Sequence, residues 1–120
     1  MKRRTAREEA FKILFQIDVN DENNLVQENL PSFTKQLVEG YLENREKIDR
    51  IIKDHLENWS IDRIARVEKT ILRIATYEMT FLDDIPHGVS INEAVELANK
   101  YGDEKSGKFV NGVLAKMIKS

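Results

Sequence analysis

Basic and aromatic residues gather near both ends of this 120-residue chain. The cations near the two ends are Lys2, Arg3, Arg4, Arg7, Lys105, Lys108, Lys116 and Lys119. Phe11 and Phe15 follow the first group, and Phe109 lies within the second. Cations neutralise phosphates and exposed rings stack on unpaired bases, so this combination is the chemistry of single-stranded RNA binding.

The net charge of −2 hides a strong separation of charge along the chain. Residues 1–7 and 105–120 hold eight cations and no acid, whereas the remaining residues have a net charge of −10. Phosphate binding depends on local charge, so an acidic protein can still bind RNA through its basic ends. We expect the RNA surface where the two chain ends come together. The alternative is that both ends are simply solvated.

The residues needed for catalysis or metal binding do not form a recognisable set. There is no cysteine and no glycine-rich phosphate loop. The two histidines, His55 and His87, lie in different segments without metal-ligand spacing, and we expect structural roles for both. We therefore predict that the protein is not an enzyme and needs no cofactor or metal. Because no long apolar run or secretory signal is present, we expect a cytoplasmic protein with no membrane contact.

The elements that must position these residues are predicted to be helices. Glycine and proline are scarce, and apolar residues recur at spacings of three and four. We predict an all-α fold, a compact bundle of six to seven helices arranged as two small sub-bundles, roughly 1–57 and 60–120, within one domain. The predicted helices span about 5–18, 33–42, 44–59, 60–82, 90–101 and 103–119, with a short helix before residue 29.

Several local signals define where these helices begin and end. Two capping boxes, at residues 5–8 and 90–93, are expected to start helices, and Asn44 could separate two others. Gly102 is expected in a left-handed conformation after a helix, and Asp103 or Ser106 can cap the last one. Gly112 lies inside the last helix at a cost of about 1 kcal/mol. A neighbouring helix or RNA that approaches its backbone closely could explain this cost.

Some side chains allow two interpretations. Phe11 is expected in the core, whereas Phe15 and Phe109 could be core or surface residues. Glu68 and Glu78 fall within the apolar sector of the helix predicted over 60–82, and a buried carboxylate needs a partner. An internal ion pair with an arginine is expected for Glu78. For Glu68 the alternative is an edge position at which a second protein docks.

Several segments together resemble the NusB family of bacterial transcription antitermination factors. They are KRRTAR at 2–7, residues 10–15, RVEK at 66–69, ILRIA at 71–75, VSINEAVELA at 89–98 and KFVNGVL at 108–114. The last two segments are highly specific, and the resemblance covers nearly the whole chain except about 19–32. It implies an all-helical fold of two small bundles and no catalysed reaction.

The resemblance also implies partners and site residues. Family members pair with NusE, a small-subunit ribosomal protein, and the pair binds boxA single-stranded RNA of nascent transcripts, notably ribosomal RNA leaders. With NusA and NusG, the pair helps RNA polymerase to resist termination; a homodimer is also possible. The implied RNA-binding residues here are Lys2, Arg3, Arg4, Arg7, Lys105, Gly107, Lys108 and Phe109.

The implied NusE-facing residues are Phe15 and Glu68. Some relatives have tyrosine in place of Phe15, so a hydroxyl contact to NusE is unavailable here. Lys105 replaces an acid of some relatives, which should favour RNA. A helical protein–protein adaptor without any RNA role is the alternative function.

Overall fold

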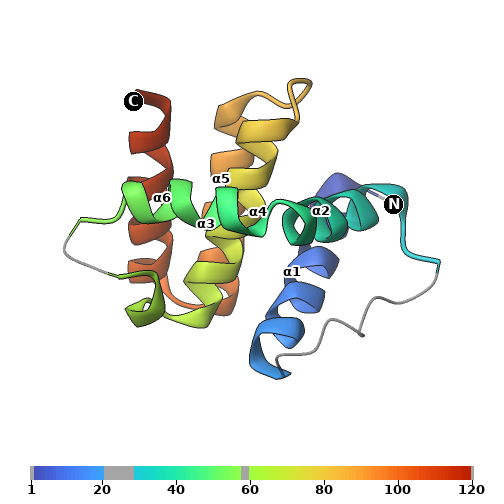
Figure 1. Cartoon of the computed structure of the whole chain (residues 1–120), viewed down its shortest axis with the longest axis horizontal. Coiled ribbons are helices and arrows are strands. Elements are labelled where there is room, and N and C mark those ends of the chain that lie inside the picture. Colours follow the sequence, from blue (N-terminus) through green and yellow to red (C-terminus); the bar gives the residue numbers. More distant parts are fainter. Residues whose placement is uncertain (1, 21–28, 58–59, 120) are drawn as a thin grey trace.

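Helices make up the regular structure of the described part of this computed structural model, which covers residues 2–20, 29–57 and 60–119. They are α1 (Arg3–Asn20), α2 (Ser32–Glu43), α3 (Arg45–Asp54), η2 (Ile61–Arg63), α4 (Arg66–Phe81), α5 (His87–Tyr101) and α6 (Glu104–Lys119). Figure 1 shows α1 and α2 on one side, α5 and α6 on the other, and α3 crossing in front of α4. The predicted all-α fold is confirmed. The short helix predicted before residue 29 lies outside the described residues.

The central element is α4, which packs against α1, α2, α3, α5 and α6. It is buried on most of its circumference, as expected for a helix whose apolar residues are not confined to one stripe. Its buried residues are Thr70, Ile71, Leu72, Ile74, Ala75, Thr76, Tyr77 and Glu78. The core is one continuous cluster, to which α1–α3 and α4–α6 both contribute. The division into two sub-bundles remains a prediction.

The two predicted capping boxes are wrong. Helix α1 already begins at Arg3, so Thr5 lies inside it, and α5 begins at His87, directly after Pro86. Proline suits this position because its fixed φ leads into a helix. Ser90 is buried within α5, where its hydroxyl donates to Glu78 Oε1 at 2.9 Å. The serine satisfies a buried carboxylate instead of a helix end.

The long helix predicted over 60–82 is also wrong in its first part. Ile61–Arg63 form a short 3-10 turn, Ile64 and Ala65 are extended, and α4 begins only at Arg66. Ile64 is nevertheless buried in the core, because the bend turns its side chain inward. Apolar spacing therefore predicted which residue is buried but not the path of the backbone. Glu68 lies in the first turn of α4 as a result.

Two glycines and one asparagine differ from expectation. Gly102 has φ −112°, so it is not left-handed; a Cβ there would meet the Ser106 side chain and the Ala98 carbonyl. A Cβ on Gly112 would meet no described atom within 4 Å, so no neighbouring helix approaches it. Asn44 lies between α2 and α3 as predicted, but its amide donates back to the Gly40 carbonyl at 2.8 Å. Asp103 does cap α6 through the Ser106 N–H at 2.9 Å.

The two histidines have different surroundings. His55 is half-buried at the end of α3, with Nδ1 2.8 Å from the Ile51 carbonyl oxygen. His87 is the exposed first residue of α5. Across the described residues, none of the helices has the length and apolar character to cross a membrane.

A buried ion pair fastens α1 to α4. The Arg7 guanidinium donates to both oxygens of Glu78, at 2.9 and 2.8 Å, and the two side chains are 5% and 1% exposed. Ser90 from α5 completes the acceptor's contacts, and the Phe33 ring of α2 lies 5.3 Å from the Arg7 guanidinium carbon. Four helices thus meet at this charge pair. The internal ion pair expected for Glu78 is confirmed.

Besides Arg7, two carboxylates of α1 also hold this helix against its neighbours, and the first of them is Asp18. Asp18 contacts Arg66, Lys69 and Arg73 of α4 at 3.1–3.3 Å. Burial raises the pKa of Asp18, but Lys69 and Arg73 outweigh burial, so its pKa lies below the ordinary value.

Glu8 extends this anchoring from α1 to the end of α5. It accepts from Lys100 Nζ at 2.6 Å and from the Tyr101 hydroxyl at 2.7 Å, and these hydrogen bonds lower the pKa of Glu8. Together with Asp18, Glu8 places carboxylates of α1 on both α4 and α5.

Removing one member of the buried pair should destabilise the protein strongly. We expect Glu78→Ala to lower the free energy of unfolding by about 3–5 kcal/mol, because it leaves the Arg7 guanidinium buried without its partner. Urea unfolding followed by circular dichroism measures this. Arg3→Ala, which breaks the exposed pair with Asp84, is the control and should cost at most about 1 kcal/mol. Equal small losses in both variants would contradict the anchoring role.

The anchoring carboxylates should make stability depend on acid pH. A carboxyl whose folded pKa lies below its unfolded value, 3.8 for Asp18 and 4.5 for Glu8, contributes stability above that value. The contribution is lost as the pH falls through the folded pKa. We expect Asp18→Asn and Glu8→Gln to flatten the fall in melting temperature below about pH 4.5. Asp62→Asn, on exposed η2, should leave the profile as steep as in the unmodified protein.

Candidate nucleic-acid and partner-protein interface

The first turn of α1 presents the N-terminal cations. Arg3 and Arg4 have 52% and 70% of their side chains exposed, and Lys2 is also exposed. Arg3 Nη2 lies 3.2 Å from Asp84, in the turn before α5. Arg4 donates to both oxygens of Glu93 on α5 at 3.0 and 2.9 Å, and this hydrogen bonding lowers the pKa of Glu93. Arg3 and Arg4 are accessible but already have carboxylate partners.

Arg7, one of the residues predicted to bind RNA, lies inside the protein. Its relative exposure is 4%, and its guanidinium is held by Glu78. The buried position leaves no surface for a phosphate to approach, so a direct RNA contact by Arg7 does not fit this structure. Sequence reasoning grouped Arg7 with its basic neighbours because Glu78 lies 71 positions away along the chain.

The start of α6 presents the second group of predicted RNA-binding residues. Lys105 and Lys108 are exposed, and Phe109 is half-buried against the core. Gly107 is buried, and a Cβ on it would collide with the Asn99 side chain of α5. Gly107 therefore lets α6 pack closely on α5 rather than facing a ligand. Of the two phenylalanines left open by the sequence, Phe109 keeps part of its ring available.

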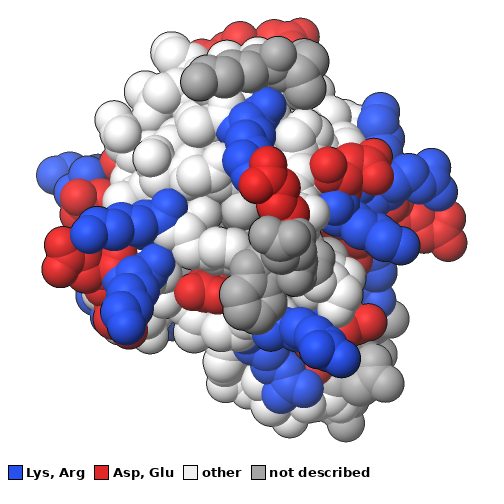
Figure 2. Space-filling model, turned by 90° about the vertical axis from the view of Figure 1, so that its left-hand side faces the viewer, with Lys and Arg blue, Asp and Glu red and all other residues white. Residues whose placement is uncertain are grey.

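The two basic segments do not come together as expected. Figure 1 shows the chain ends on different sides of the molecule, with α4 and α5 between α1 and α6. Figure 2, which looks onto the left-hand side of Figure 1, shows blue cationic side chains separated by white surface and interspersed with red acidic ones. An RNA that contacts both segments must therefore cross the surface between them.

A groove lies beside the start of α6, between α1, the start of α4 and the end of α5. Its volume is about 280 Å³, and it is lined by Phe11, Lys12, Phe15, Gln16, Val67 and Tyr101. We call these six residues the aromatic groove. The Phe11 ring centroid lies 5.8 Å from that of Phe15 and 4.8 Å from that of Tyr101. Phe11 is buried as predicted, whereas Phe15 is half-buried and partly faces the groove.

The structure brings Phe15 and Glu68 to the same region. Glu68 follows Val67 in the first turn of α4 and is half-buried. Within the described ranges, no ion pair or hydrogen bond of Glu68 is seen, which removes the internal-ion-pair interpretation. Sequence reasoning missed Tyr101 as a groove residue, although its position just before Gly102 placed an aromatic ring at the end of α5.

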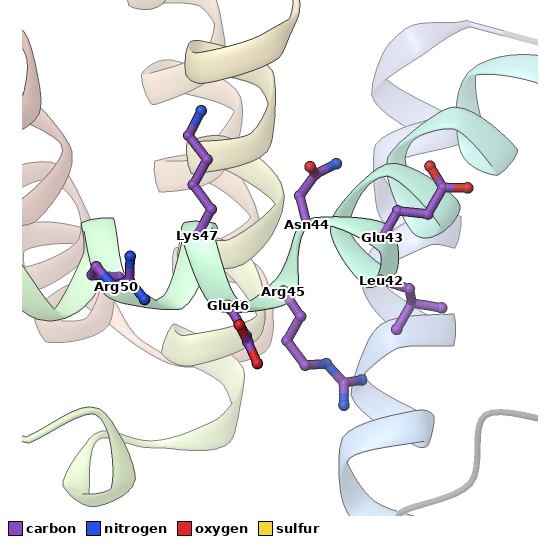
Figure 3. A pocket seen from close by; sticks show the side chains of 7 residues that line it. All are labelled: Leu42, Glu43, Asn44, Arg45, Glu46, Lys47 and Arg50. Carbon is purple, nitrogen blue, oxygen red and sulfur yellow. The ribbon is translucent and has the colours of Figure 1, made fainter.

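Another recess, of about 550 Å³, lies where α2 meets α3, and its lining is charged. In Figure 3, the Lys47 side chain points away from Arg45 and Glu46, so these groups do not converge on a common point. Among residues 2–20, 29–57 and 60–119, no group of three potential metal ligands occurs either.

Comparison with known proteins agrees with this geometry. A profile described as the NusB family matches residues 4–119. The transcription antitermination protein NusB of Bacillus licheniformis is 59% identical over 96% of this chain and 95% of its own length. The NusB of Bacillus subtilis is 53% identical over 96% of this chain and 93% of its own length.

Solved structures show the same fold. NusB of T. maritima has a TM-score of 0.90 at 39% identity, covering all of this chain and 92% of its own. A NusB chain crystallised with NusE and double-stranded RNA has a TM-score of 0.86 at 37% identity, covering 98% of this chain and 96% of its own. The chain therefore belongs to the NusB family of transcription antitermination proteins, which is not an enzyme family.

Proposed function

We propose that this protein pairs with NusE and that the pair binds boxA single-stranded RNA of nascent transcripts. In the cytoplasm, together with NusA and NusG, the pair then helps RNA polymerase to resist termination. The observation that carries this proposal is that the aromatic groove and the basic helix α6 lie next to each other. Tyr101 lines the aromatic groove, and only Gly102 and Asp103 separate it from the basic helix α6. A solved relative that contains NusB, NusE and RNA supports the combination of partners.

The proposed RNA contacts are Lys2, Arg3, Arg4, Lys105, Lys108 and Phe109. The five lysine and arginine side chains, which are all exposed, can bind phosphates, and the exposed part of the Phe109 ring can stack on a base. Arg7 and Gly107 act indirectly, because they fix α1 and α6 in place through Glu78 and Asn99. The first six residues would therefore contact RNA directly, whereas Arg7 and Gly107 would position the helices that carry them.

The partners of Arg3 and Arg4 affect the strength of RNA binding. A phosphate must take the place of Asp84 or Glu93, so part of the gain from each new contact is offset by the loss of an existing one. Both members of the Arg3–Asp84 pair are more than half exposed, so this ion pair is weak and exchangeable. The Arg4–Glu93 pair is bidentate and its carboxylate is 16% exposed, so it is harder to replace. The isolated protein should therefore bind RNA weakly, and NusE should add the contacts that make binding tight.

The aromatic groove is the proposed binding site for NusE. Phe15 and Val67 supply apolar surface, and Glu68 supplies a carboxylate without an internal ion-pair partner. A half-buried carboxylate gains from a cationic or N–H donor on a partner, and the described residues provide no such donor for Glu68. A docked protein would also extend the RNA surface beyond Lys105, directly next to α6.

RNA binding should depend on sequence and salt. We expect the complex with NusE to bind boxA RNA more tightly than a scrambled RNA in fluorescence-anisotropy titrations. Arg3→Ala with Arg4→Ala should weaken binding and reduce the slope of log affinity against log salt by about 0.7 for each lost phosphate contact. Arg63→Ala, an exposed arginine on η2, is the control. Equal affinity for both RNAs would reject specific recognition; unchanged binding by the double variant would favour the adaptor alternative.

NusE binding should depend on the aromatic groove. Glu68→Lys should weaken NusE binding measured by calorimetry, with little change in melting temperature, because Glu68 has no internal ion pair to lose. Phe15→Ala should weaken it too, through lost apolar contact. Glu46→Lys on α3 makes the same charge change away from the groove and should bind NusE normally. If Glu68→Lys instead unfolds the protein at much lower temperature, a structural role for Glu68 replaces the partner contact.

A further inference from the structure

One exposed stripe of α6 consists of three lysines and one glycine. A helix turns 100° per residue, so Lys105, Lys108, Gly112 and Lys116 lie within about 40° of one direction. We call these four residues the α6 ridge. All four are exposed, and the ridge points away from the buried residues Val110 and Leu114 on the opposite side of the helix. With a rise of 1.5 Å per residue, the ridge is about 16 Å long.

The cations of the α6 ridge are available for exchange. Lys108 lies 3.8 Å from Glu104, and both side chains are more than three-quarters exposed. Lys116 lies 3.0 Å from Glu57, whose side chain is 74% exposed. Water screens such surface pairs, so a phosphate can replace either carboxylate at little cost. The ridge therefore presents positive charge along the whole length of α6.

Nothing in the described structure requires a glycine at position 112. Its φ is not positive, and a Cβ built on it would meet no described atom within 4 Å. Gly107, in the same helix, differs because a Cβ there would collide with Asn99. Glycine lowers helix stability in the middle of a helix, so its presence at an exposed site indicates a need for open backbone. Within the described residues nothing approaches that backbone, so it is open to a ligand.

We propose that the α6 ridge is a track for the sugar–phosphate backbone of single-stranded RNA, which crosses the helix directly over Gly112. Charge complementarity selects a polyanion, because the ridge has three lysines and no apolar side chain. The missing side chain at Gly112 lets phosphates approach Lys108 and Lys116 together, one helical turn to either side. This inference rests on the proposed RNA binding and extends it beyond Lys105, Lys108 and Phe109 to the far half of α6.

A side chain added at Gly112 should make the protein more stable and at the same time weaken RNA binding. Because leucine favours helices more than glycine does, Gly112→Leu should raise the melting temperature by a few degrees. The same variant should bind RNA several-fold more weakly, with NusE affinity unchanged. Gln36→Leu puts leucine on an exposed face of α2, across the molecule from α6 in Figure 1, and should leave RNA affinity unchanged. A misfolded variant could not show the rise in melting temperature.

Charge changes at the far end of the ridge give an independent test with opposite signs. Lys116→Gln should weaken RNA binding and reduce the salt slope by about 0.7, the value for one phosphate contact with a single strand. Glu57→Gln should strengthen RNA binding, because it frees Lys116 from its carboxylate. Lys35→Gln, an exposed lysine of α2, is the control for the loss of one charge.

The possible failures can be told apart in the same titrations. If the unmodified protein with NusE binds no RNA in a salt-dependent way, both the proposed function and the ridge are rejected. If it binds RNA and loses affinity on Arg3→Ala with Arg4→Ala, but Gly112→Leu and Lys116→Gln bind normally, the ridge alone is rejected. If Gly112→Leu loses NusE and keeps RNA, the face is a protein contact and the track is overturned.

Discussion

A guanidinium and a carboxylate that are shielded from solvent hold this bundle together. Arg7 and Glu78 join α1 to α4, and Ser90 and Phe33 bring α5 and α2 to the same point. Desolvated charges are costly unless every donor and acceptor finds a partner, so the helices can pack here only in the arrangement that completes these contacts. The position of α1, and with it the exposed arginines and the aromatic groove, follows from this arrangement.

The fold class and the burial of Phe11 could be predicted because they depend on local composition and spacing. The bend at Ile64 could not, because spacing in the sequence does not distinguish one long helix from a short turn followed by a helix. The burial of Arg7 was missed for a similar reason. Its partner is distant in the sequence, and only tertiary packing shows that a basic residue beside surface arginines points inward.

Ion pairs on the surface explain how a protein with a net charge of −2 could bind RNA, as proposed above. Arg3, Lys108 and Lys116 contact exposed carboxylates, so each of these three cations has a partner that a phosphate can replace. Such exchange gives modest affinity and strong dependence on salt. Modest affinity fits the proposed pairing with NusE, because selectivity would then arise from the assembled pair and not from either member.

The turn between α5 and α6 has a consequence for how the sequence can vary. Gly102 and Asp103 are packed against Ala98 and Ser106, and they alone join the aromatic groove to the basic helix. One residue added early in α6 would rotate the rest of the helix by about 100° and turn its lysines away from their common direction. Changes of length here should therefore be excluded, because they would alter the placement of the α6 lysines relative to the aromatic groove.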